Sequence, residues 1–314
     1  MAKEPVRLPD AEAKVLAEQE QGDGPVEGLR QERSVGPITT DEAPTADELS
    51  APPPSSSNGN AGLLVELPTK GLLYGDSLPG GTVEVIPITF KAEKRLAGGG
   101  GNMASIMDTL LRTCVQTDAL SLDDWITTDA FYLLLRLRGH TYPSDMFPYH
   151  FPVQCDACGA TFQHECHIPD DFDIRWLEDD AEEPFFIDLP DSGVTISTRL
   201  LRRKDEKQIA KYAARAGRRR RGVDIEGDGE DMSYAYRMAT RITEVDGDKL
   251  PLEKRLVWLD TLSAIDTLEI KDYFEENDPG MDTTMWIDCT SCGYENEETL
   301  PLTGEFFRPR RNRK

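Results

Sequence analysis

The spacing of hydrophobic and polar residues predicts a strand followed by a helix early in the chain. Residues 82–90, TVEVIPITF, alternate with a period of two, which is typical of a half-buried strand. Residues 103–115 repeat with the period of a helix, and one face carries Met103, Ile106, Met107, Leu110, Leu111, Cys114 and Val115. Because free cysteine packs as a small apolar residue, we expect Cys114 to be a buried thiol in this face.

A second, more uniformly apolar stretch predicts a central helix. Its body is AFYLLLRLR (130–138), with Thr127, Thr128 or Asp129 as the N-cap and Gly139 as the stop. The glycine-rich run AGGGGN (97–102) precedes both helices, and we interpret it as a flexible joint.

The second half of the chain mixes strand and helix patterns. Residues 183–201 predict a β-hairpin that turns at Asp191-Ser192-Gly193. Residues 203–217, 232–243 and 252–277 predict helices, and an Asp-Gly turn lies in the connection 244–251. Arg218–Arg221 begin a charged loop whose acidic end, IEGDGED, offsets their field. Strands and helices are segregated along the chain, so the predicted fold class is α+β, with helices and short antiparallel strands.

The first 60 residues differ from the rest in composition. They hold 12 acidic and 5 basic residues, no Phe, Trp or Tyr, and the run APPPSSSNGNAG begins near their end. Such a segment buries too little apolar surface to fold alone, so we expect a disordered or extended arm. Its anchors on a partner would be its few apolar side chains, Val15, Leu16, Val26, Leu29, Val35 and Ile38.

Charge and hydropathy narrow the possible functions. The net charge of −23 argues against general nucleic-acid binding, which needs a basic surface. No run of 18 apolar residues and no signal-peptide pattern occurs, so we expect a soluble protein made in a reducing cytoplasm. In that compartment six cysteines indicate a metal site or free thiols before disulfides.

Two cysteine pairs with matching surroundings predict a structural metal site. CDACG (155–159) and CTSCG (289–293) each follow a short strand pattern and precede an alternating polar stretch. Together Cys155, Cys158, Cys289 and Cys292 supply the four thiolates of a closed tetrahedral Zn²⁺ site, a zinc ribbon split between two knuckles. A dithiol redox motif or a disulfide between the knuckles are alternatives, and so is replacement of one ligand by His164, Cys166 or His167.

The sequence predicts no enzyme. Four thiolates leave no open position on zinc for a catalytic water. The phosphate-binding loop, the serine-hydrolase elbow, the zinc-protease helix and the dinucleotide-binding fingerprint do not occur in it.

Several stretches resemble the T4-type bacteriophage baseplate hub proteins of contractile tails. The likeness covers about residues 64–309 and rests on LPTKGLLYG (67–75), on the leucine-rich helix ending LLRLRGHTY, on both Cys pairs and on the final Phe-Phe-Arg-Pro. It implies a non-enzymatic structural component of the baseplate hub or wedge region, in several symmetric copies in the virion. A hub assembly factor absent from the mature virion is the alternative, and a zinc-ribbon protein that binds nucleic acid is a second one.

The implied partners are other tail proteins, with neither nucleic acid nor membrane. Contacts would come from the arm and from the C-terminal end, where Phe306 and Phe307 would enter a pocket of a partner or of this chain, with RPRRNRK at its rim. The charges of the acidic run 170–183 and of the basic segments Arg218–Arg221 and RPRRNRK would set the register in which subunits dock on one another. The expected divisions are an arm (1–61), a strand–helix part (62–152), a first knuckle (153–169), an inserted hairpin and helices (170–283), a second knuckle (284–309) and a basic tail (310–314).

Overall fold

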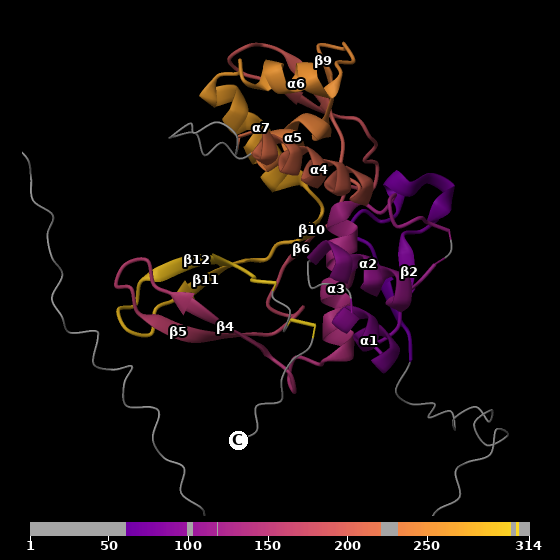
Figure 1. The fold of residues 1–314 in the computed structure, drawn as a ribbon, viewed down its shortest axis with the longest axis vertical. Helices are drawn as coiled ribbons and strands as arrows, with labels where there is room; N and C mark the ends of the chain where they lie inside the picture. The colour runs from indigo at the N-terminus through magenta and orange to yellow at the C-terminus, as the bar shows by residue number, and fades with distance from the viewer. Residues whose placement is uncertain (1–60, 99–102, 118, 221–231, 303–305, 308–314) are drawn as a thin grey trace, which may run out of the picture. The chain divides into compact units, whose positions relative to one another are not determined.

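The computed structural model describes residues 61–98, 103–117, 119–220, 232–302 and 306–307. These residues form helices and short antiparallel strands, so the α+β class is confirmed (Figure 1). Residues 1–60 of the expected arm with its six anchors, the acidic end of the charged loop and the basic tail lie outside the described residues. No helix in the described part of the chain combines the length and apolar character that a membrane span requires.

A three-stranded antiparallel sheet, a 3-10 helix and three α-helices form the N-terminal part of the main hydrophobic cluster. The sheet order is β1-β2-β3. Its strands and the adjacent helices are β1 (Leu63–Glu66), β2 (Thr82–Val85), β3 (Val115–Gln116), the 3-10 helix η1 (Leu72–Ser77), α1 (Phe90–Gly98), α2 (Met103–Cys114) and α3 (Thr127–Thr141). The predicted apolar face of α2 is buried, and Cys114 is 1% exposed. Burial raises the pKa of this thiol, as expected for a residue that serves packing. Of the joint expected at 97–102, Ala97 and Gly98 belong to α1, and residues 99–102 lie outside the described residues.

The central helix α3 differs from its prediction at both ends. Ile126 is the N-cap, without a side-chain cap hydrogen bond, and the helix continues past Gly139 to Thr141. Gly139 is needed for close packing instead of termination. A Cβ there would lie 2.7 Å from Cδ of Pro169 and 2.9 Å from the carbonyl oxygen of Ile168, too close for any side chain.

Asp129 is a buried anchor of the LPTKGLLYG segment and not a helix cap. Its side chain is fully buried, and it accepts hydrogen bonds from the backbone and hydroxyl of Thr69 (3.2 and 2.5 Å) and from the hydroxyl of Tyr74 (2.8 Å). The Tyr74 hydroxyl also accepts from the backbone of Ile126 at 3.0 Å. Burial raises the pKa of Asp129 to about 6, although the bonds from Thr69 and Tyr74 oppose that shift.

We expect Asp129→Asn to destabilise the protein by about 1–3 kcal/mol at pH 7, because an amide satisfies these donors less well. A carboxyl whose pKa is raised on folding contributes stability below its unfolded pKa and loses it as pH rises through about 6. The wild type should therefore gain stability relative to the variant between pH 7 and pH 4.5. Denaturant unfolding of both proteins at each pH measures this difference, and groups that titrate in both cancel. A difference that does not change with pH would contradict the prediction.

A second hydrophobic cluster is formed by residues of the sheet β7-β8-β9 and of helices packed against it. The strands and helices of this region of the chain are β7 (Phe185–Asp188), β8 (Thr195–Thr198), β9 (Ile242–Val245), α4 (Arg203–Arg220), α5 (Met232–Arg241), α6 (Leu252–Leu259) and α7 (Ala264–Asn277). The predicted hairpin is confirmed, with β7 antiparallel to β8 and Gly193 at φ 70° in its turn. The Asp-Gly turn is also present, at Asp246 and Gly247 with φ 50° and 80°.

Three helix predictions in this region are corrected. The helix expected over 232–243 ends at Arg241, because Ile242 begins β9 and completes the sheet beside β8. The single helix expected over 252–277 is two helices, since Ser263 caps α7 by accepting from the backbone of Asp266 at 3.2 Å. The helix expected over 203–217 continues to Arg220, so most of the arginine run is helical and not loop.

The chain enters and leaves this region at neighbouring positions. The short strands β6 (Ile174–Arg175) and β10 (Gly280–Met281) pair antiparallel, with Ile174 opposite Met281. Both residues pack on the main cluster. The two cysteine segments, which lie on either side of these strands in the sequence, are therefore anchored to one core.

Phe306 and Phe307 occupy an intramolecular pocket in the main cluster. They are 0% and 2% exposed, and the Phe306 ring meets Tyr149 edge to face at 5.1 Å between centroids. Arg138 packs over Phe306 at 5.6 Å and donates to the backbone oxygens of Tyr142 and Phe147 at 2.9 and 2.8 Å. Of the two expected locations for these aromatic rings, the structure shows the one within this chain.

Candidate metal centre

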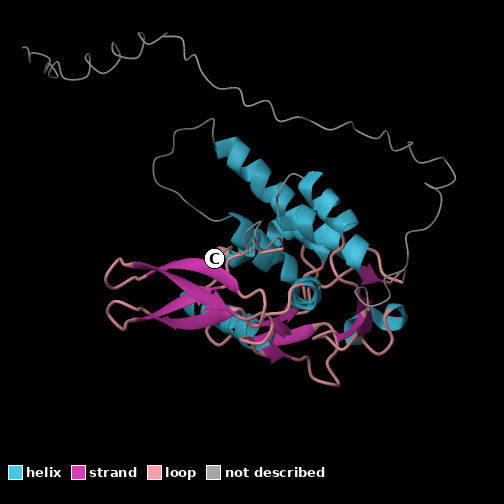
Figure 2. Cartoon of the chain, turned by 90° about the horizontal axis from the view of Figure 1, so that it is seen from below, coloured by secondary structure: helices cyan, strands magenta, loops and turns pink. Residues whose placement is uncertain are grey.

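Each cysteine pair lies in the turn of an antiparallel hairpin. The first hairpin is β4 (Tyr149–Gln154) with β5 (Thr161–Cys166), and the second is β11 (Thr284–Asp288) with β12 (Glu295–Thr299). Figures 1 and 2 show the two hairpins side by side. The strand pattern predicted around each Cys pair is thus confirmed.

The hairpins correspond residue by residue. The last strand pairs before the turns are Gln154 with Thr161 and Asp288 with Glu295, so adding 134 to a position in the first hairpin gives its counterpart in the second. The same shift relates Cys155 to Cys289 and Cys158 to Cys292. The local fold is therefore repeated.

Equivalent backbone hydrogen bonds shape both turns. Cys155 donates to Ala160 at 2.9 Å, and Cys289 donates to Tyr294 at 2.8 Å. Gly159 and Gly293 donate back to the carbonyl oxygens of Cys155 and Cys289 at 2.8 and 2.9 Å. Both glycines have positive φ, 72° and 73°, which a residue with a side chain adopts only at a cost. The glycine after each Cys pair therefore fixes the knuckle.

The four thiol sulfurs converge. All four Sγ atoms lie within 4.8 Å of one another. Between the two hairpins, Sγ of Cys155 is 3.7 Å from Sγ of Cys292, and Sγ of Cys158 is 3.7 Å from Sγ of Cys289. The first cysteine of each pair is buried and the second is exposed, so the cluster has an inner and an outer side.

Neighbouring backbone amides and thiols shift two of the cysteine pKa values in opposite directions. The Ser291 amide donates to Sγ of Cys289 at 3.4 Å, and this bond leads the contacts that lower the pKa of Cys289 to about 6. The Tyr294 amide also favours the Cys292 thiolate, but contacts with the other three thiols outweigh it and raise the pKa of Cys292 to about 12. Clustered thiolates repel one another, and a bound cation would offset that repulsion.

This geometry fits a tetrahedral metal ion better than a disulfide. Zinc–sulfur bonds of about 2.3 Å in a tetrahedron place neighbouring sulfurs about 3.8 Å apart, close to the observed 3.7 Å. A disulfide needs about 2.05 Å. All six cysteines are free thiols in the structure. The donor set is four sulfurs, which favours a soft or borderline metal and leaves no fifth position for a substrate.

The alternative ligands lie outside the cluster. Among the described residues, the group of possible metal ligands contains only the four knuckle cysteines. The ring of His164 packs edge to face on Phe151, and Nε2 of His167 lies 3.4 Å from Oε1 of Glu165. Cys166 is buried at the end of β5, and burial raises the pKa of its thiol to about 12. His164 and Cys166 belong to β5, His167 follows it, and none of the three is part of the four-sulfur cluster.

One polar residue beside the cluster was missed by sequence reasoning. Asn296 on β12 is 1% exposed, and its Oδ1 accepts from the backbone of Asp156, within the other knuckle, at 3.0 Å. In the sequence this role is indicated only by Asn296 itself, within YENEET. The corresponding position of the first hairpin holds an apolar residue, Phe162.

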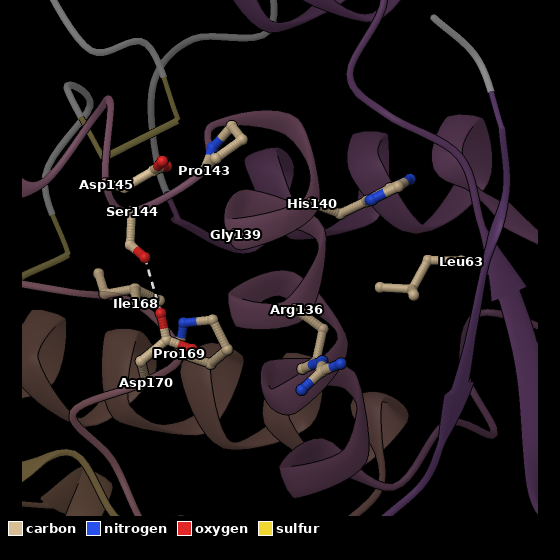
Figure 3. A pocket seen from close by; sticks show the side chains of 10 residues that line it. All are labelled: Leu63, Arg136, Gly139, His140, Pro143, Ser144, Asp145, Ile168, Pro169 and Asp170. Atoms are coloured by element: carbon tan, nitrogen blue, oxygen red, sulfur yellow. Dashed lines mark hydrogen bonds between the residues drawn. The ribbon is translucent and has the colours of Figure 1, made fainter. Parts of the chain in front are cut away.

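A separate surface pocket of about 290 Å³ lies between α3 and the loops at 143–145 and 168–170. Figure 3 shows the side chains of Ser144 and Asp170 pointing toward one another, with His140 directed away from both. Ser144 donates to Asp170 at 2.7 Å, and Nε2 of His140 lies 2.9 Å from the carbonyl oxygen of Ala61. The imidazole of His140 is therefore not placed to act as a base toward the Ser144 hydroxyl.

Comparison with known protein families gives a match. A family model described as T4 bacteriophage base plate protein matches residues 74–308, well over half of the chain. The matched range includes both Cys pairs, Asn296 and the buried Phe306 and Phe307. No significant match was found among curated proteins or among solved structures.

Proposed function

Since the chain belongs to the T4 bacteriophage base plate protein family, we propose that it is a non-enzymatic structural component of a contractile phage tail, located in the hub or wedge region of the baseplate. The family match over residues 74–308 carries this proposal, because it spans the cysteine hairpins, most of the main hydrophobic cluster, the second cluster and the aromatic C-terminal end. Family membership supports contacts with other tail proteins, and we propose that several copies occur in a symmetric assembly.

We further propose that one structural Zn²⁺ per chain binds Cys155, Cys158, Cys289 and Cys292. The ion would neutralise the charge of the clustered thiolates and hold the two hairpins together. The four-sulfur donor set and its spacing of 3.7 Å support zinc in a structural role. Residues 170–283 would then be an insert whose ends are held near the zinc-bearing hairpins.

Virion composition and gene deletion test the proposed role together. Mass spectrometry of purified mature virions should detect this protein in a fixed ratio to other baseplate proteins, and phage lacking the gene should make no complete baseplates. Absence from the mature virion with the same assembly block would identify an assembly factor instead. Intact infectious tails without the protein would overturn both roles.

Binding to nucleic acid is the less favoured alternative. The exposed positions of β12 include Glu295 and Glu297, and the net charge is −23. Such a surface repels phosphates. A mobility-shift assay at low salt, where electrostatic binding is strongest, should show no retarded species.

The arm provides a separate prediction. We propose that residues 1–60 lie extended on neighbouring subunits, anchored by the apolar residues named above. A variant that starts at Ala61 keeps the contact between its carbonyl oxygen and His140 and should unfold at the wild-type temperature with its metal bound. Co-purification with other tail proteins should fall at least tenfold. A lower unfolding temperature would show instead that the arm is part of the folded core.

A further inference from the structure

Asn296 breaks the equivalence of the two hairpins at one buried position. Its strand partner is Ile287, whereas the corresponding pair in the first hairpin is Phe162 with Val153. Phe162 packs against the main hydrophobic cluster. A polar side chain that is 1% exposed at the equivalent place needs hydrogen-bond partners, because an unsatisfied buried amide costs about 1–3 kcal/mol.

The amide of Asn296 finds those partners in both hairpins. Its Nδ2 donates to the carbonyl oxygens of Ile287 and Tyr294, both at 3.1 Å and both in its own hairpin. Its Oδ1 accepts from the backbone N–H of Asp156 at 3.0 Å, in the turn between Cys155 and Cys158. The first two bonds fix the side chain, and the third joins it to a residue 140 positions away.

We infer that Asn296 is a positioning residue that sets one metal half-site against the other. The inference rests on the proposed zinc site. Within each knuckle, backbone bonds fix the turn, but these bonds do not determine where the other knuckle lies. The hydrogen bond between Asp156 and Asn296 links the two knuckles directly beside the metal ligands, and it therefore fixes the position of one knuckle relative to the other. It holds Cys155 and Cys158 opposite Cys289 and Cys292 before the ion binds, so binding costs less ordering.

The experiment compares two replacements of Asn296. Asn296→Leu keeps a branched Cγ in a somewhat larger apolar side chain and removes all three hydrogen bonds. Asn296→Ala removes the hydrogen bonds and most of the side-chain volume. Zinc affinity is measured by competition with a chromogenic chelator. We expect both variants to bind zinc about 10–100-fold more weakly than the wild type, the usual range for loss of a residue that orients metal ligands. The absorption spectrum of the cobalt-substituted proteins should also change, because it reports the arrangement of the four sulfurs.

Two control variants separate positioning from general stability. Asp129→Asn weakens a buried hydrogen-bond cluster elsewhere in the core, and Glu297→Gln changes the exposed neighbour of Asn296 on β12. Both should keep wild-type zinc affinity and cobalt spectrum. Wild-type affinity in both Asn296 variants, or an equal loss in Asp129→Asn, would overturn the inference and leave the zinc proposal standing. A wild-type protein that binds no zinc would overturn the zinc proposal itself, and this inference with it.

Discussion

Serine in place of Cys289 is expected to abolish zinc binding and to unfold the two hairpins. Cys289 is the more buried ligand of the second knuckle, and a serine hydroxyl is a poor substitute for a thiolate. Zinc contributes about 10–16 kcal/mol to small zinc-dependent folds, as much as the whole stability of an ordinary domain. Because Phe151, Val153 and Ile287 of the hairpins belong to the main cluster, the loss should spread into the core.

Metal content and thermal unfolding measure this effect. Natively purified wild type should contain one zinc per chain, and Cys289→Ser should contain none and should lose its cooperative transition or unfold at a temperature lower by at least 15 °C, roughly the shift for several kcal/mol. A strong chelator should bring the wild type to the same state, and added zinc should restore only the wild type.

Cys166→Ser is the matched control for this experiment. Cys166 is as buried as Cys289 and lies at the end of β5 in the first hairpin, but it is outside the four-sulfur cluster. The Cys166→Ser variant should be somewhat less stable than the wild type, because the serine hydroxyl is buried, and it should still bind one zinc per chain. Full zinc occupancy in Cys289→Ser, or loss of zinc in Cys166→Ser, would contradict the proposed ligand set.

The cysteine knuckles were predictable from sequence because their geometry is local. The spacing of each Cys pair, the glycine that follows and the flanking strand patterns all lie within about 20 residues, and they are repeated 134 positions later. That repetition favoured one shared site over two separate motifs. The bond between Asn296 and Asp156 has no local signature, since its partners are 140 residues apart.

The errors in the fold prediction have the same origin. Gly139 was predicted to end the helix, yet its role is close packing against Ile168 and Pro169, which approach from another segment of the chain. Asp129 reads as a cap, yet its partners Thr69 and Tyr74 precede it by 60 and 55 residues. The break before α7 was accessible to local reasoning, because Ser263 followed by Asp266 is a helix-start pattern.

The second large effect is expected at the aromatic end of the chain. Phe306→Ala should destabilise the protein by about 3–5 kcal/mol, because the ring is fully buried and little can collapse into the space it leaves. The substitution also removes the ring beneath the buried guanidinium of Arg138, whose Nε has no hydrogen-bond partner in the described structure. Phe306→Leu should cost less, since it keeps apolar volume but loses the contact with Arg138. Denaturant unfolding of the three proteins measures these differences.

This burial changes how the docking role of the C-terminal end has to be tested. Deletion of residues 304–314 would remove Phe306 and Phe307 with the basic tail, so a block in tail assembly could reflect an unfolded core. Deletion of 308–314 alone keeps both rings and should leave the unfolding free energy at the wild-type value. If the basic residues dock on a partner, the shorter deletion should still reduce infectious tails, whereas Phe306→Ala should lower both stability and titre. Normal titre with 308–314 deleted would restrict the function of this end to the packing of Phe306 and Phe307 against Tyr149 and Arg138.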